Sequence, residues 1–218
     1  MRTPVAELRD LPRRIAYQWG PRIGSALRKR LVLLQHPHAT VRFGEGVHVG
    51  PGFSLHIPDG GSFIVGPRVE FRRGFRAEIS DRGQIVIGAG SVFTYDVLIQ
   101  CSTRIEIGER CMFGQATAVF DGNHRFRDLS TPMLEQGFDF REITIDDDAT
   151  ITTKCTILND IGKRAVIGAN SVVTAPIPAY SVAAGSPARV IDYFGPEAER
   201  PPEGDASGVA TSGSETTP

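Results

Sequence analysis

The sequence lacks long hydrophobic runs, a strong net charge and paired cysteines. No stretch of about 18 uncharged apolar residues occurs, and the longest useful run is Leu31 to Leu34, so no membrane-spanning helix or secretory signal is expected. The 24 Lys and Arg are balanced by 25 Asp and Glu, which argues against a basic nucleic-acid binder. Cys101, Cys111 and Cys155 form no CxxC pair, so we expect reduced core thiols in a cytoplasmic protein, without a structural metal site.

The composition divides the chain into three zones. Hydrophobic residues make up 40%, enough for one folded domain with extensions. We expect a basic amphipathic helical segment over 1–40, a β-rich domain over 41–191 and an acidic disordered tail over 192–218. Residues 1–35 contain eight Lys or Arg and two Asp or Glu. This segment either caps the end of the domain or touches an anionic membrane surface or lipid-linked substrate.

A six-residue repeat fills most of the middle zone. Glycines that follow a bulky apolar residue recur six positions apart, as in Gly44 and Gly50, or Gly108 and Gly114. This period fits a solenoid in which each six-residue unit is one short strand plus a turn, and three units make a triangular coil of which about seven would form. A β-sandwich with glycine-rich turns is disfavoured, because its strands recur every 8–12 residues.

The repeat is interrupted once, over residues 121–141. The segment is polar and irregular but includes Phe126, Phe138 and Phe140, so we expect it to pack against something and to have a function. His124 stands at its start, in the run Asp121-Gly-Asn-His124, where an imidazole can face a cleft.

A series of motifs gives residues 103–191 a more specific likeness. These motifs are Ile105-Glu-Ile-Gly-Glu-Arg-Cys-Met-Phe-Gly114, Asp121-Gly-Asn-His124, Pro132-Met-x-x-Gln136-Gly137, Ala165-Val-Ile-Gly-Ala-Asn-Ser-Val-Val-Thr174, Ile177-Pro178 and Ala184-Gly-Ser-Pro-Ala-Arg-Val-Ile191. They resemble the hexapeptide-repeat acyltransferases, which have a left-handed parallel β-helix. Within that group they are most similar to galactoside and maltose O-acetyltransferases, and the Pro-x-x-x-Gln-Gly segment favours the polysaccharide O-acetyltransferases.

The resemblance implies an enzyme that transfers an acyl group, expected to be acetyl, from coenzyme A to a hydroxyl of a carbohydrate or glycolipid. It also implies a homotrimer with active sites between subunits, without metal or nucleic acid. His124 would be the general base, since neutral imidazole has a pKa near the working pH. Residues 1–35 would allow contact with the inner face of the membrane.

The resemblance assigns further roles to individual residues. Asn123 would support His124, and Asp121, Asp128 and Glu135 are alternative carboxylates for orienting its ring. Asp96 stands where the family has an acceptor-binding Asn, or is an ordinary turn residue. The residues expected to bind coenzyme A are Thr152, Thr153, Ala169, Thr174 and Arg189.

The expected donor side departs from the family pattern. Ala149-Thr-Ile-Thr152 replaces Val-Trp-Ile-Gly, Thr174-Ala175 replaces Thr-Lys, and the spacing from Ile157 to Ile161 is two residues short. Lys154, Lys163, Arg164 and Arg189 are replacement cations. A β-helix that has lost catalysis and serves as a binding or scaffold protein is therefore the alternative. A zinc carbonic anhydrase of this fold is excluded by the spacing of the histidines.

Overall fold

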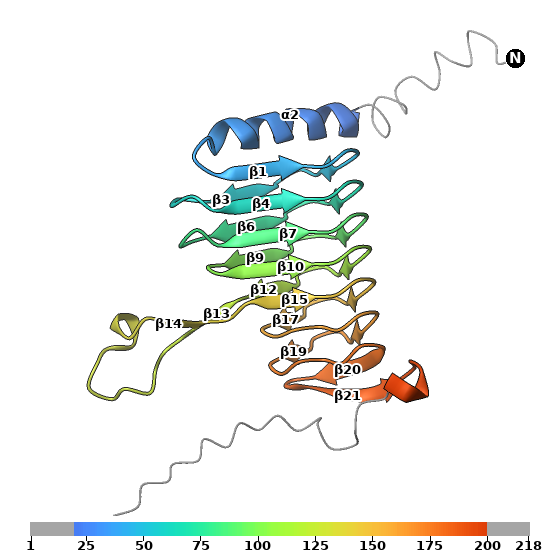
Figure 1. Cartoon of the computed structure of the whole chain (residues 1–218). Helices are drawn as coiled ribbons and strands as arrows, with labels where there is room; N and C mark the ends of the chain where they lie inside the picture. The colour runs from blue at the N-terminus through green and yellow to red at the C-terminus, as the bar shows by residue number, and fades with distance from the viewer. Residues whose placement is uncertain (1–19, 200–218) are drawn as a thin grey trace, which may run out of the picture.

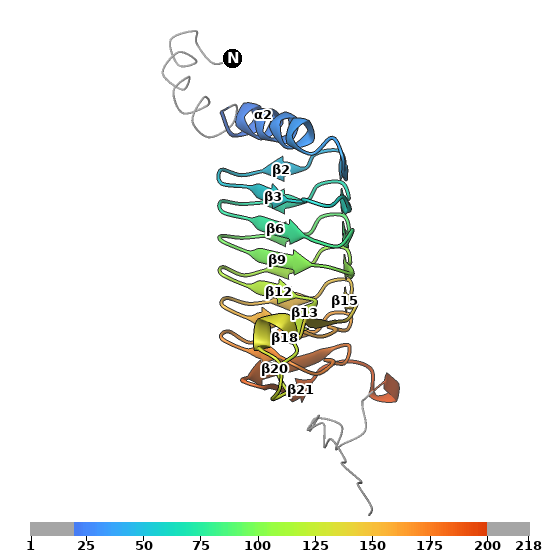
Figure 2. The same ribbon diagram turned by 90° about the vertical axis from the view of Figure 1, so that its left-hand side faces the viewer.

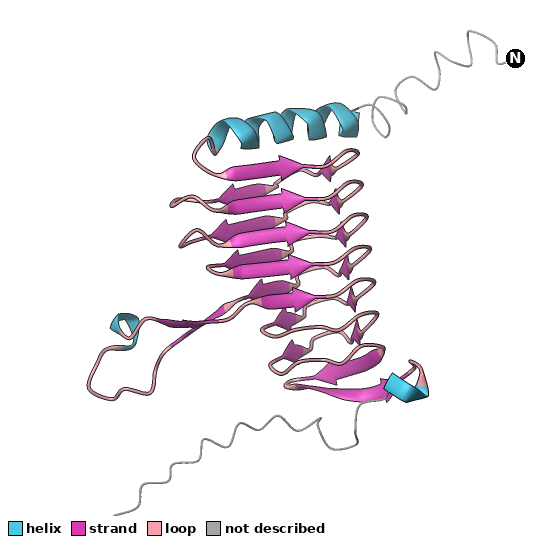
Figure 3. Ribbon diagram, in the orientation of Figure 1, coloured by secondary structure: helices cyan, strands magenta, loops and turns pink. Residues whose placement is uncertain are grey.

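The described part of the chain, residues 20–199 of a computed structural model, is a parallel β-helix closed at one end by a helix (Figure 1). Successive coils stack along one axis, and each contributes a strand to each of three sheets (Figures 2 and 3). The predicted left-handed hexapeptide-repeat fold is confirmed.

Three parallel sheets form the walls of the solenoid. The first consists of β1 (Thr40–Phe43), β4 (Ser62–Val65), β7 (Gln84–Ile87), β10 (Arg104–Ile107) and β15 (Ile143–Ile145). The second consists of β2 (His48–Val49), β5 (Glu70–Phe71), β8 (Val92–Phe93), β11 (Met112–Phe113), β16 (Thr150–Ile151), β18 (Val166–Ile167), β20 (Ser181–Gly185) and the antiparallel β21 (Ala188–Tyr193). The third consists of β3 (Ser54–His56), β6 (Arg76–Ile79), β9 (Leu98–Cys101), β12 (Ala118–Phe120), β17 (Thr156–Ile157) and β19 (Val172–Val173).

The coils are less uniform than three six-residue units predict. Thr40 pairs with Ser62 of the next coil, 22 positions later in the sequence, whereas Thr150 pairs with Val166, only 16 positions later. The extra residues of the early coils lie in the turns from the third sheet to the first. The short spacing after Ile157 is accommodated by a tight turn, and isolated bridges continue the first wall through Ile161 to Ile177.

Alternation within each short strand fills the core. Inward side chains of the three walls are buried, and aromatic rings stack from coil to coil. The centroids of Phe71 and Phe93 are 5.0 Å apart, and those of Phe93 and Phe113 are 4.6 Å apart. This rigid stack fixes the positions of the turns that leave the solenoid.

Helix α2 (Gly20–Gln35) covers the first coil. The Val49 amide donates to Ser25 Oγ over 2.8 Å, and Arg28 Nε and Lys29 Nζ donate to the carbonyls of Val49 and Val47, each over 2.8 Å. These bonds satisfy backbone groups that have no preceding coil. α2 is therefore the predicted cap, whereas the expected segment before residue 20 lies outside the described residues.

Removing the Ser25 hydroxyl is expected to weaken this cap. Ser25→Ala leaves the buried Val49 amide without an acceptor, and the free energy of unfolding should fall by about 1–3 kcal/mol. Urea unfolding measures the change, and Ala26→Ser, on the exposed side of α2, is the control. Equal stability of Ser25→Ala and the wild type would contradict the capping role.

The C-terminal end differs from the prediction of disorder from residue 192. β21 continues to Tyr193, the Phe194 amide donates to the Tyr180 carbonyl over 3.0 Å, and the short helix η3 (Glu197–Glu199) follows. Pairing with β20 orders these residues because β21 covers the last edge of the second sheet. Residues 200–218 of the predicted tail lie outside the described residues.

Candidate active site on an arm of the solenoid

The interruption at residues 121–141 forms an arm that leaves the fourth coil (Figure 1). β13 (Gly122–His124) pairs antiparallel with β14 (Phe138–Phe140), and η2 (Met133–Glu135) lies near the tip. This hairpin is absent from the prediction, although the alternation of Phe138 and Phe140 is the signal that could have indicated a strand. A Cβ on Gly122 would lie 2.5 Å from the Phe140 ring, so the close pairing requires glycine at this position.

Asp121 fixes the base of the arm. Its carboxylate is buried, and Oδ2 accepts hydrogen bonds from the Ser102 and Thr103 amides, each over 2.7 Å, and from Thr103 Oγ1 over 2.9 Å. The Arg141 amide donates to the Asp121 carbonyl over 2.8 Å and closes the hairpin. Asp121 therefore positions the arm, which differs from the expectation that it could orient the imidazole.

We call the Asp121 carboxylate with its hydrogen bonds to Ser102 and Thr103 the latch. The buried thiol of Cys101 lies beside it. Burial, and then the nearby Asp121 carboxylate, raise the pKa of Cys101 to about 12, and burial raises the pKa of Cys111 to about 11. Both thiols are therefore protonated at neutral pH, and the predicted core position of the three cysteines is confirmed by their burial.

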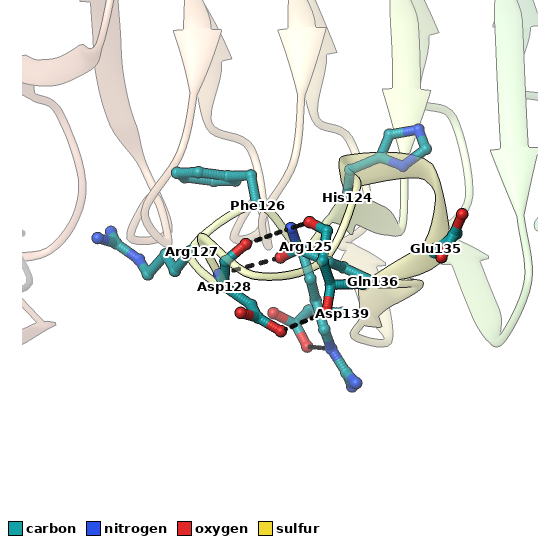
Figure 4. A pocket seen from close by; sticks show the side chains of 9 residues that line it. His124, Arg125, Phe126, Arg127, Asp128, Glu135, Gln136 and Asp139 are labelled. Atoms are coloured by element: carbon teal, nitrogen blue, oxygen red, sulfur yellow. Dashed lines mark hydrogen bonds and ion pairs between the residues drawn. The ribbon is translucent and has the colours of Figure 1, made fainter.

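His124, at the end of β13, lies at the rim of an open hollow of about 510 Å³, with its ring directed away from Asp128 and Asp139 (Figure 4). Its ring lies against Phe138, with 4.1 Å between centroids, and the side chain remains exposed. The hollow is lined entirely by arm residues, namely His124, Arg125, Phe126, Arg127, Asp128, Thr131, Glu135, Gln136 and Asp139. Within the described chain, no hydrogen bond joins a carboxylate to the His124 ring.

The predicted supporting residues have different surroundings. Glu135 shares the hollow with His124, and Asn123 is exposed opposite Asp139 in the hairpin. Asp128 is occupied within the arm, because it accepts hydrogen bonds from Ser130 and Thr131. Of the three carboxylates considered for orienting the ring, Glu135 is thus the one with no competing partner described.

The structure of the arm depends on two residues that the sequence analysis did not assign. Gln136 Nε2 donates to the carbonyls of Asp128 and Thr131, over 2.8 and 2.7 Å, and Arg125 pairs with Asp139 over 2.6 Å. These contacts hold the two sides of the hollow together. Gln136 belongs to the Gln-Gly motif, so the motif was the available signal for its role.

The ionisation of Asp128 gives a pH-dependent prediction. Hydrogen bonds from Ser130 and Thr131 lower the pKa of Asp128 from 3.8 to about 2. Because the pKa of Asp128 is lower in the folded than in the unfolded chain, its ionised carboxylate stabilises the arm at pH values above the unfolded-state pKa. This stabilisation is lost as the pH falls from about 4 to about 2. The Ser130 amide NMR signal should therefore keep its neutral-pH position at pH 4 in the wild type. A midpoint near 3.8 would contradict the hydrogen-bonded state, and Asp128→Asn should abolish the titration.

A second group of predicted residues lies on stacked turns between the second and third sheets. We call turns 94–97, 114–117, 152–155 and 168–171 the turn ridge. Consecutive turns are joined by backbone hydrogen bonds, such as those from the Ala116 amide to Tyr95 and from the Asn170 amide to Thr153. The ridge brings together Asp96, Thr152, Thr153 and Ala169.

Two residues expected near coenzyme A lie elsewhere. Thr174 follows β19, at the turn toward the first sheet, and Arg189 lies in β21. Asp96, at φ 57°, fills the space beside Gly74, where the Cβ of any other residue would meet its carboxylate. The arm and the ridge follow different sheets of the same chain, so His124 does not line a common hollow with the ridge residues.

Comparisons with known proteins show what the chain is similar to. No protein-family model matches it. It is 30% identical over 163 residues to the probable acetyltransferase Rv3034c of Mycobacterium tuberculosis, covering 72% of this chain and 53% of the relative. It is 31% identical over 186 residues to a serine acetyltransferase of Bacillus licheniformis, covering 84% and 66%. The chain thus spans about half to two thirds of the length of these relatives.

Solved structures share the fold. A maltose O-acetyltransferase from Clostridium difficile 630 is 26% identical with a TM-score of 0.51, covering 71% of each chain. A hexapeptide-repeat acetyltransferase from Vibrio cholerae, solved with acetyl coenzyme A, is 22% identical with a TM-score of 0.53, covering 78% of this chain and 79% of that one. Within the described residues, no group of His, Cys, Asp and Glu could hold a metal, and no helix is long and apolar enough to span a membrane.

Proposed function

The chain is a homologue of the hexapeptide-repeat acetyltransferases, and we propose that it transfers an acetyl group from coenzyme A to a hydroxyl of a carbohydrate or glycolipid. The observation that carries this proposal is the exposed imidazole of His124 in a hollow on a braced arm. The chain's own residues hold this imidazole outside the solenoid, where a substrate can reach it.

The proposed chemistry needs one base and one donor to the oxyanion. Neutral His124 removes the proton of the acceptor hydroxyl as its oxygen attacks the thioester carbonyl carbon, and a C–O bond forms. A backbone N–H at a turn stabilises the oxyanion. The C–S bond then breaks, and the imidazolium returns the proton to the departing thiolate. Glu135, which lines the same hollow, and Asn123, which precedes His124 in β13, are proposed to support the ring.

We propose that coenzyme A lies along the turn ridge. Thr153 and Ala169 present small side chains there, which leaves room for an extended pantetheine arm, and the exposed Lys154 supplies charge for phosphate groups. The Thr152 hydroxyl donates to the Ile167 carbonyl at the end of β18, and the Thr153 hydroxyl donates to the Gln115 carbonyl of the preceding turn, so both fix the surface of the ridge. Thr174 and Arg189 would contact the distal part of the molecule.

The separation of arm and ridge supports a homotrimer with shared sites. Phe126, Leu129 and Leu134 are exposed on the arm, with Leu129 fully exposed, and such apolar side chains fit a surface of a neighbouring copy. Docking of the arm over the ridge of that copy would bring His124 to the thioester. Asp96, on the same ridge, would bind acceptor hydroxyl groups.

A binding protein without catalysis is the second candidate. The observation that favours it is the altered donor side, where Thr152 and Ala175 stand in place of the family's Gly and Lys. The two functions differ in turnover. A catalyst consumes acetyl-CoA in the presence of an acceptor, whereas a scaffold binds a ligand without releasing free thiol.

The deciding experiment measures thiol release from acetyl-CoA with a panel of acceptors. The panel holds free sugars, polysaccharides, glycolipids and L-serine, since one relative is a serine acetyltransferase. The raised pKa values of Cys101 and Cys111 keep the protein's own background low. We expect acceptor-dependent release and an O-acetylated sugar by mass spectrometry. Binding without turnover would support the scaffold, and turnover with L-serine alone would overturn the carbohydrate acceptor.

The proposed location is the cytoplasm. The three cysteines of the described region are free and buried, which suits a reducing compartment where acetyl-CoA is available.

A further inference from the structure

Helix α2 has an apolar face that nothing in the described chain covers. Ile23, Leu27, Leu31 and Leu34 are 61%, 59%, 54% and 78% exposed. Their spacing of four, four and three residues places them on one side of the helix, opposite the buried Ser25 and Val32. We call these four residues the outer stripe. Four large aliphatic side chains in one exposed row mark an interaction surface.

The charges around the outer stripe indicate its partner. α2 contains no acidic residue, and Arg28 and Lys29 are directed to carbonyls of the first coil. Arg30 is exposed beside the stripe, within one helical turn of Leu27 and Leu34, and Arg22 is exposed on the flank of the helix. An apolar protein groove that covered the stripe would have to desolvate these two guanidinium groups. Anionic lipid headgroups would instead pair with them, while the aliphatic side chains enter the acyl boundary.

We propose that the outer stripe of α2 binds the surface of an anionic lipid bilayer. α2 lies across the end of the solenoid, with the coils on one side of it (Figures 1 and 2). The stripe faces away from the coils, because Ser25 and Val32 face them. Contact through the stripe therefore stands the solenoid upright on the membrane.

This orientation fixes the height of the candidate site. The arm leaves the fourth coil, so three coil spacings of about 4.8 Å and the roughly 10 Å width of α2 place the base of the arm about 25 Å from the lipid surface. His124 would therefore reach the sugar portion of an acceptor that is anchored in the bilayer by its lipid. In the proposed trimer, which is the one part of this inference that rests on the proposed function, three stripes would face the same way and their weak contacts would combine.

The test is co-sedimentation of the full chain with lipid vesicles, without acyl donor. Vesicles of about 30% phosphatidylglycerol in phosphatidylcholine should bind the protein, pure phosphatidylcholine should not, and high salt should release it. The double variant Leu27→Glu and Leu31→Glu should lower the bound fraction roughly tenfold or more. Ile191→Glu, which is 66% exposed at the opposite end of the solenoid, is the matched control and should bind like the wild type.

Three outcomes would overturn the inference. The wild type could fail to bind anionic vesicles, or the double variant could bind as well as the wild type. The double variant could also melt many degrees below the wild type, which would show that the stripe is covered within the protein itself. Since no coenzyme A is present, each outcome leaves the proposed acyl transfer untouched, and absence of turnover leaves the membrane contact untouched.

Discussion

Replacing His124 with alanine is expected to lower kcat for acyl transfer by about 10²–10⁴-fold. The sugar hydroxyl is a weak nucleophile and must lose its proton as it attacks, and within the hollow His124 is the group suited to receive that proton at neutral pH. KM for acetyl-CoA should change little, because the ridge that is proposed to bind it is unaltered. Steady-state kinetics with the acceptor found in the panel measure both constants.

The control for this variant is another exposed histidine. His56 lies on β3, outside the arm and the ridge, so His56→Ala should retain the wild-type kcat. If kcat is unchanged in His124→Ala, the general-base role is wrong.

Asp121→Ala is expected to release the arm from the solenoid. Three hydrogen bonds to one carboxylate oxygen are lost, and the partly buried amides of Ser102 and Thr103 are left without an acceptor. The free energy of unfolding should fall by about 2–4 kcal/mol. Because a displacement of about 1 Å in a reacting group is costly, kcat should also fall by about 10²-fold in protein that remains folded.

Thr103→Val provides the matched control at the latch. It removes one hydroxyl donor but leaves the carboxylate bonded to both amides, so most of the activity and stability should remain. Full activity of Asp121→Ala would show that the latch does not position the imidazole.

The coils could be predicted from the sequence, and the reason is local. Each six-residue unit carries its own signal, a buried apolar residue followed by a residue suited to the turn, so units such as Ile107-Gly108 and Phe113-Gly114 reveal the walls without knowledge of their neighbours. The position of His124 in the interruption was also visible. The number of residues in each coil could not be predicted, because it depends on turns that carry no repeating side-chain pattern.

The contacts of the arm could not be predicted for a different reason. The role of Asp121 depends on the amides of Ser102 and Thr103, which the stacking of two coils brings beneath it. No pattern within 121–141 encodes that neighbour. Likewise, Asp96 and Ala169 share the turn ridge only because coils of unequal length place their turns in register. In the proposed trimer the arm of one copy meets the ridge of another, so no pattern within one chain encodes that contact.

Subunit mixing tests the central claim, a site shared between copies, most directly. His124→Ala lacks the base, and Ala169→Trp should block the ridge with a bulky side chain at an exposed turn. Each variant alone should be inactive. After the two are unfolded and refolded together in equal amounts, about a quarter of the wild-type activity should return, since one site in four then combines an intact arm with an intact neighbouring ridge. Mixed protein that forms trimers but stays inactive would contradict the shared site.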